Sequence, residues 1–179
     1  MTDPQNGHPA PDERIRRLTH QSSLREKILE YRLLGELGVE LLERDIDFTV
    51  LHSVSDHHGY DAVVDAGTVE RHIQLKATTV GTTTRNVPIS TRLAAKPSGC
   101  VIWMVFDPVE RRFTEFRWFG AAPGQPLPDL GERPVRHSRA NALGVKAIRP
   151  EQRSLGLARF ERLSSIQAVA DRLFGTEAG

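Results

Sequence analysis

The chain has 179 residues, of which 39% are hydrophobic and 26% charged, ordinary values for one globular domain. Its one cysteine, Cys100, excludes an internal disulfide framework and a cysteine-based zinc site. The longest apolar run, residues 100–106, is too short to span a membrane, and the first residues lack a signal-peptide pattern. We therefore expect a cytoplasmic protein without a membrane partner.

Charge is divided unevenly along the chain. Residues 1–70 carry 7 Lys/Arg and 14 Asp/Glu, whereas residues 71–179 carry 17 and 9, so the two parts have net charges of −7 and +8. An acidic part beside a basic part suits a metal-dependent enzyme that acts on a polyanion. Two oppositely charged solvated faces, or a surface for self-association into a homodimer, are the alternatives.

The N-terminal region predicts an arm and then a helix. Residues 1–21 are polar, rich in proline and without periodicity, so we expect a disordered arm. A helix is expected to begin near Ser22 or Ser23, either of which can cap it, and to run to about Arg44. Apolar residues recur in it at helical spacing, namely Leu24, Ile28, Tyr31, Leu34, Val39 and Leu42.

Strands are expected next. Residues 46–51 alternate between apolar and polar side chains, as a half-buried strand does. Residues 60–66 and 69–77 are two further strand-like runs on either side of Gly67. Runs separated by a short glycine turn are typical of a β-hairpin.

The middle of the chain predicts a short helix and two more strands. Residues 90–96 suit a helix capped by Ser90, because Pro97 follows directly. Residues 100–106 are continuously apolar, which indicates a central strand covered on both faces. Residues 113–119 alternate as the next strand.

The last third of the chain differs in composition. Residues 121–131 are rich in proline and glycine and predict a surface loop. Residues 132–162 hold 8 Lys/Arg against 3 Asp/Glu, and a final helix is expected over residues 164–174. We therefore divide the ordered chain into a core at 22–120 and a basic C-terminal extension at 121–179, whose final helix packs on the core.

Polar side chains suited to chemistry gather on the predicted hairpin. Asp61 begins its first strand, and Gln74 and Lys76 lie late in the second. Because strand side chains alternate between faces, Gln74 and Lys76 share one face. A two- or four-residue turn would bring Asp61 to that face, whereas a three-residue turn would put it on the other.

These groups have a chemical use when they lie together. A carboxylate and an amide oxygen suit Mg²⁺, a hard cation that takes oxygen ligands. A lysine beside them can polarise a water molecule or offset the charge of a phosphodiester. The competing interpretation is a structural Asp–Lys pair on an edge strand.

The segments Gly59-Tyr60-Asp61 and Gln74-Leu75-Lys76, after a leading helix with a glutamate, resemble the PD-(D/E)XK nuclease superfamily in its Q-x-K variant. The resemblance covers about residues 24–119 and is closest to Holliday-junction-resolvase-like and restriction-endonuclease-like members. It implies a restriction-endonuclease-like core of helix, three-stranded antiparallel meander, second helix and further strands. With the C-terminal helix this is a mixed α/β (α+β) fold. The implied activity is that of an endonuclease that hydrolyses DNA with Mg²⁺ or Mn²⁺.

The resemblance also implies roles for single residues. Asp61 and Gln74 would be metal ligands, and Lys76 would stand beside the attacking water. Gln74 replaces the second acid of the family and removes a negative charge from the site. We expect Glu30 on the first helix to compensate as a third ligand, in preference to Glu26 one turn away. An ordinary solvated helix carboxylate is the alternative.

Contacts to nucleic acid are expected outside the hairpin. Thr78 and Thr79 follow Lys76 in a Thr/Gly-rich segment whose hydroxyls suit phosphate oxygens. Arg133, Arg136 and Arg139 belong to the basic extension and suit phosphate contact. The rival to an enzyme is a non-catalytic nucleic-acid-binding module on the same fold.

Overall fold

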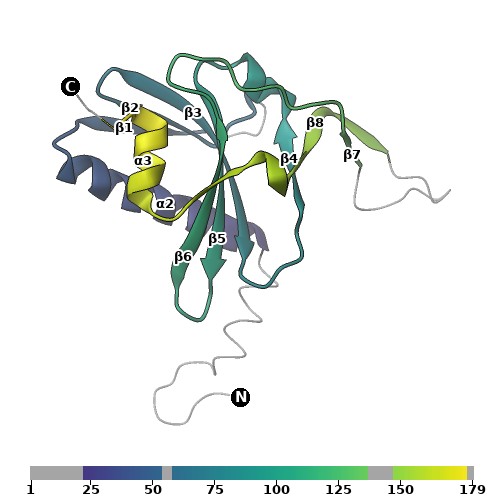
Figure 1. Cartoon of the computed structure of the whole chain (residues 1–179), viewed down its shortest axis with the longest axis horizontal. Helices are drawn as coiled ribbons and strands as arrows, with labels where there is room; N and C mark the ends of the chain where they lie inside the picture. Colours follow the sequence, from purple (N-terminus) through teal and green to yellow (C-terminus); the bar gives the residue numbers. More distant parts are fainter. Residues whose placement is uncertain (1–21, 54–57, 137–146, 177–179) are drawn as a thin grey trace, which may run out of the picture.

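The protein has a mixed α/β fold (Figure 1). The computed structural model describes residues 22–53, 58–136 and 147–176. A six-stranded mixed sheet has the order β1-β2-β3-β5-β6-β9, and a three-stranded sheet has the order β4-β8-β7. The expected arm at 1–21 and the expected contact residue Arg139 lie outside the described residues.

The first helix, α2, spans Ser22–Glu43, which confirms the helix expected there. Its buried side differs from the apolar set picked out by spacing. Leu29, Leu33, Leu37 and Leu41 face the core and are at most 2% exposed. Leu34 is the one member of the predicted set that is buried, whereas the others are 52–67% exposed: Leu24, Ile28, Tyr31, Val39 and Leu42. The helix therefore has two apolar sides, and periodicity alone does not tell which one packs.

Three antiparallel strands follow α2, namely β1 (Phe48–His52), β2 (Ala62–Ala66) and β3 (Val69–Thr79). Ala66 pairs with Val69, so two residues form the turn between β2 and β3. Gly67 lies in that turn at φ 61°, a conformation that favours glycine. The expected hairpin is thus confirmed with its shortest turn.

The connection from β3 to the parallel strand β5 (Gly99–Asp107) holds β4 (Asn86–Ser90) and a 3₁₀-helix, η2 (Thr91–Ala95). Ser90 caps η2 by accepting a hydrogen bond from the Arg92 N–H, as expected. The short helix is a 3₁₀-helix rather than an α-helix, because five residues before Pro97 leave room for barely more than one turn.

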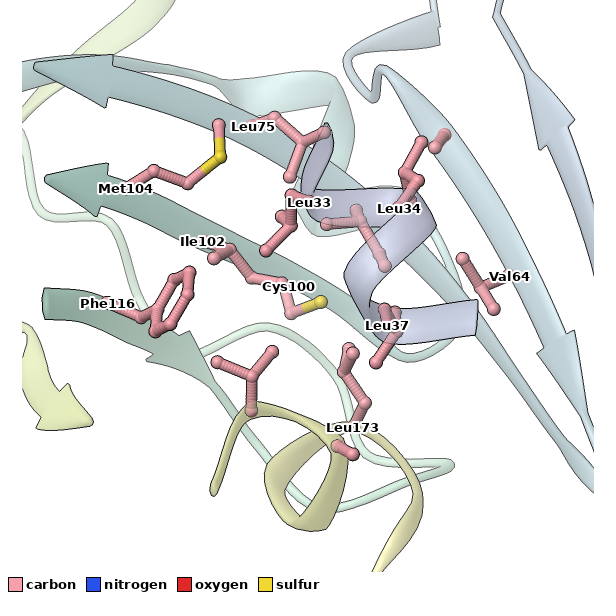
Figure 2. Close-up of a cluster of buried hydrophobic side chains, with 14 of the residues drawn as sticks. Leu33, Leu34, Leu37, Val64, Leu75, Cys100, Ile102, Met104, Phe116 and Leu173 are labelled. Atoms are coloured by element: carbon pink, nitrogen blue, oxygen red, sulfur yellow. The ribbon is translucent and has the colours of Figure 1, made fainter. Parts of the chain in front are cut away.

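The central strand β5 is buried from Gly99 to Phe106, which confirms a strand covered on both faces. One face packs with α2 and the C-terminal helix around side chains such as Leu33, Ile102 and Leu173 (Figure 2). The opposite face carries Val101 and Trp103 and packs on a second apolar cluster. The next strand, β6 (Arg112–Gly120), is antiparallel to β5.

The C-terminal part adds strands that the sequence patterns did not predict. They are β7 (Pro134–Arg136), β8 (Ile148–Gly156) and β9 (Glu161–Leu163), with the 3₁₀-helix η3 (Leu157–Arg159) between the last two. β8 pairs with β4, and β9 pairs with β6, so both sheets contain strands from either side of residue 120.

The final helix, α3, spans Ile166–Phe174 and confirms the helix expected at the C-terminus. Ser165 caps its start, and Val169, Ala170 and Leu173 are buried against the core. Among the described residues, no helix is long and apolar enough to cross a membrane.

Candidate functional site

The pairing between β2 and β3 ends at Asp61, and the two strands separate beside Gln74 and Leu75. We call this point the fork, and it is the centre of the site. The Asp61 N–H donates to the Ile73 carbonyl at 2.8 Å, after which the two strands separate. The Leu75 N–H, which has no β2 partner, instead donates to Asp61 Oδ2 at 2.6 Å. The carboxylate therefore ends the hairpin by taking the place of a backbone acceptor.

The two-residue turn settles which face Asp61 occupies. Extending the register by one pair beyond Ala62 and Ile73 brings Asp61 opposite Gln74. Directly opposed residues of two paired strands lie on the same face of the sheet, so Asp61 shares the face of Gln74 and Lys76. All three residues line one cleft. This cleft has a volume of about 630 Å³.

The electrostatics of Asp61 show an unfavourable environment for its charge. Burial raises the pKa of this carboxyl above its ordinary value, against the opposing effects of the Leu75 N–H and of Lys76. The negative charge of Glu30 raises the pKa further, and Lys27 lowers it. Asp61 therefore interacts with a cation from β3 and with a carboxylate from α2.

Helix α2 contributes two carboxylates to the wall of the cleft, Glu26 and Glu30. Glu30 is the more enclosed of the two, and its Oε2 accepts a hydrogen bond from Lys27 Nζ at 2.7 Å. This bond is the main reason why the pKa of Lys27 is raised. Glu30 is thus the helix carboxylate that acts on Asp61, and it is already paired with a neighbouring ammonium group.

Gln74 joins the fork to the second sheet. Its side chain is 8% exposed, and its Oε1 accepts a hydrogen bond from the Ser90 N–H at 3.1 Å. Gly59 approaches the same place at φ 82°, where a Cβ would lie 2.7 Å from Ser90 Oγ and 2.9 Å from the Leu93 nitrogen. The first residue of the Gly-Tyr-Asp segment is therefore a glycine for steric reasons.

The donor set can be tested against Mg²⁺ from these contacts. Among the described residues, no three His, Cys, Asp or Glu side chains gather closely enough to hold a metal ion. Mg²⁺ is commonly bound through one or two carboxylates, with water and substrate phosphate oxygens completing its ligands. Asp61 and Glu30 supply two carboxylates, and Gln74 Oε1 keeps a second lone pair beside its bond to Ser90. The residues present fit such a site.

The two expected threonines lie outside the cleft. Thr78 and Thr79 line a separate hollow of about 380 Å³, together with Arg85 and Arg117. Thr78 is 9% exposed, and its hydroxyl is hydrogen-bonded to that of Thr82 at 2.6 Å. The structure therefore does not bring Thr78 and Thr79 together with Asp61 and Lys76.

Two of the expected arginines lie on or beside β7. Arg133 is exposed, and its guanidinium donates to Asn86 Oδ1 at 2.9 Å. Asn86 also lines the cleft, so Arg133 lies beside the cleft wall. Arg136 is exposed at the end of β7.

The far wall of the cleft is formed by residues that the sequence patterns did not single out. Arg92 on η2 forms an ion pair with Glu151 on β8 at 2.7 Å, and both line the cleft with Gln152. They meet because β4 pairs with β8, across more than 60 residues of chain. No local motif signals such a pairing, and the charged residues of β8 do not form a pattern that predicts a strand.

Comparisons of the chain with protein-family models, with curated proteins and with solved structures found no match.

Proposed function

We propose that this chain is a nuclease-like protein that hydrolyses phosphodiester bonds in DNA with the help of Mg²⁺ or Mn²⁺. The observation that carries the proposal is the convergence of carboxylate, amide and ammonium groups on one cleft. These are Asp61, Glu30, Gln74 and Lys76. Enclosing a carboxylate where its charged form is disfavoured costs stability, so a use beyond the fold is the natural explanation.

The roles follow from charge and position. Asp61 and Glu30, assisted by Gln74 Oε1, would hold the metal ion. When bound there, the metal supplies Lewis-acid activation of a phosphodiester and of a nucleophilic water. The ammonium group of Lys76, which lowers the pKa of Asp61, would orient that water and offset negative charge on the phosphate.

Two further observations support DNA as the substrate. Exposed Arg133 is hydrogen-bonded to a residue of the cleft wall, so a cation for a backbone phosphate lies beside the site, and Arg136 follows three residues later on β7. The order of α2, the antiparallel strands β1-β2-β3 and the crossover to β5 also agrees with the order that the resemblance to PD-(D/E)XK nucleases implies.

The test is incubation of the full chain with plasmid and with single-stranded, duplex and junction oligonucleotides. Each reaction is run with Mg²⁺, with Mn²⁺ and with a chelator. The proposal expects cleavage of at least one DNA substrate with either metal and none with the chelator. Cleavage that continues in chelator would contradict a metal-dependent mechanism.

A second candidate function is a DNA-binding module without catalysis. The observation that favours it is the hydrogen bond from the Ser90 N–H to Gln74 Oε1, which gives this position a structural use. Such a module would retain the same oligonucleotides in a binding assay, cleave none of them, and bind equally well in Mg²⁺ and in chelator.

A further inference from the structure

Helix α2 carries a largely exposed apolar face, on which the Tyr31 ring also packs against His52 of β1 with ring centroids 5.0 Å apart. Five large side chains on it are between 52% and 67% exposed, namely Leu24, Ile28, Tyr31, Val39 and Leu42. Scattered exposed apolar residues are normal, but a continuous stripe of them marks a contact surface. We call these five residues with Gly35 the outer stripe.

The spacing of the outer stripe is that of a helix–helix seam. Its members recur at intervals of three and four residues over five turns, on the side of α2 away from buried Leu33 and Leu37. Gly35 lies at its centre, and a Cβ added there would meet nothing within 4 Å. A glycine inside a helix costs stability relative to alanine, and the single chain offers no reason for it. A second backbone approaching closely at Gly35 would supply the reason.

The charges beside the outer stripe are self-complementary. One flank carries Arg25 and Arg32 in the N-terminal half of the helix, and Glu36 and Glu43 in the C-terminal half, and Arg32 and Glu36 are paired with each other within the chain at 2.8 Å. In an antiparallel pair of identical helices the same flanks face each other. The basic half of one copy then lies along the acidic half of the other, with Arg25 beside Glu43.

We propose that the chain forms a two-fold symmetric dimer in which α2 packs antiparallel on α2 of a second copy, crossing at Gly35. Ile28 of each copy then packs at the height of Leu42 of the other. Residues 1–21 suit the outer stripe less well than a second copy of α2 does, because Met1, Ile15 and Leu18 are their only large apolar residues. The interface is one helix wide, which is small for a protein–protein contact, so we expect weak, concentration-dependent association.

The dimer leaves the candidate site accessible. Glu26 and Glu30 line the cleft and lie on the other side of α2 from the outer stripe. The two clefts of the dimer therefore remain open, and the inference does not depend on the proposed function.

The first test is sedimentation of the full chain over a range of concentrations. The wild type is expected to change from monomer to dimer, and Ile28→Glu and Leu42→Glu to weaken association at least about tenfold. Ile148→Glu is the matched control, because Ile148 is 53% exposed on β8, in the three-stranded sheet. A wild type that stays monomeric at all concentrations overturns the proposal. The proposal is overturned in the same way if that monomer binds lipid vesicles through the outer stripe.

A second test addresses the geometry and remains informative if the glutamate variants fold poorly. Cys100 is fully buried, so a single introduced cysteine is the reactive one. Gly35→Cys lies on the proposed two-fold axis and is expected to form a disulfide-linked dimer under mild oxidation. Leu24→Cys lies eleven residues away, so its two copies would be separated by about 33 Å and should not link. Equal linking of both variants would indicate parallel helices and contradict the antiparallel dimer.

Discussion

The carboxylate of Asp61 combines a structural contact with an unfavourable charge. Its Oδ2 satisfies the Leu75 N–H at the fork, and an asparagine oxygen would satisfy the same donor. Burial nevertheless raises the pKa of the carboxyl, so the ionised form is the costly one. The contact alone therefore explains an acceptor at position 61 but not a charged one.

We expect Asp61→Asn to be more stable than the wild type near pH 7. The folded pKa lies above the ordinary value of 3.8, so the folded wild type binds more protons than the unfolded chain between those two values. Its stability falls as pH rises through this interval. The advantage of the variant should be complete above the folded pKa and shrink as pH falls toward 3.8.

Thermal denaturation of both proteins from about pH 4 to pH 8 measures this difference. Asp65→Asn is the control, because Asp65 is an exposed carboxylate on β2, the strand that begins directly after Asp61. An Asp61→Asn variant that is less stable than the wild type at neutral pH would show that the charge stabilises the fold.

Gln74→Glu probes the capacity of the fork for metal. The new carboxylate can still accept the Ser90 N–H, but it adds a negative charge opposite Asp61. Like charges this close raise each other's pKa and lower stability near neutral pH. We expect a loss of stability in chelator that Mg²⁺ reverses, measured as the melting temperature of wild type and variant in both conditions. Destabilisation that Mg²⁺ leaves unchanged would favour the binding module.

At the scale of elements, Arg71 on β3 attaches the C-terminal helix to the main sheet. Its side chain is fully buried and donates to the carbonyls of Arg172 and Leu173 at the end of α3, and to that of Ala121. A cation at the C-terminus of a helix also interacts favourably with the helix dipole. Burial lowers the pKa of the guanidinium, which reflects the cost that these hydrogen bonds offset.

Arg71→Met should lower the free energy of unfolding by about 3 kcal/mol, because three carbonyls would be left without their buried donor. Denaturant unfolding of the variant and of the wild type gives this value. Arg112→Met is the matched control, since Arg112 is exposed at the end of β6, and it should change stability by less than about 0.5 kcal/mol. An equal effect of both substitutions would contradict the role assigned to Arg71.

The elements that sequence reasoning predicted are those with strong local signals. α2 has helical periodicity, the β2–β3 hairpin has its glycine turn, and β5 has a continuous apolar run. β8 holds two charged residues and a proline in its first four positions and is a strand because β4 pairs with it. The site likewise has a part that local sequence predicts and a part that only long-range contacts create. The shared face of Asp61 and Gln74 follows from period and turn length, but the bond from Ser90 to Gln74 depends on tertiary structure.

The β7 element offers a test of DNA binding. Replacing Arg133 and Arg136 by Gln should weaken binding to all DNA sequences alike, because phosphate contacts carry no sequence information. The slope of log affinity against log salt should fall by about 0.9 for each duplex phosphate that the variant no longer neutralises. Affinity measured over a salt series gives the slope, and an unchanged slope would show that β7 does not bind DNA.

At the scale of the whole molecule, the cleft depends on both parts of the chain. α2 and the fork supply the side with Glu30, Asp61 and Lys76, and β4, η2 and β8 supply the opposite wall. The opposite wall adds the Arg92–Glu151 ion pair. The chain segment beyond residue 120 is thus part of the site, as well as of the core through α3.

The central claim is that DNA is cleaved at the fork by a metal site that requires the charge of Asp61. Single-turnover cleavage of one DNA substrate by wild type, Asp61→Asn and Asp65→Asn, with Mg²⁺ and with binding measured in parallel, tests it most directly. We expect Asp61→Asn to lose cleavage while binding DNA as tightly as the wild type or more tightly, because a charge that repels phosphate is gone. Asp65→Asn should retain both properties. Cleavage by Asp61→Asn at the wild-type rate would contradict the claim.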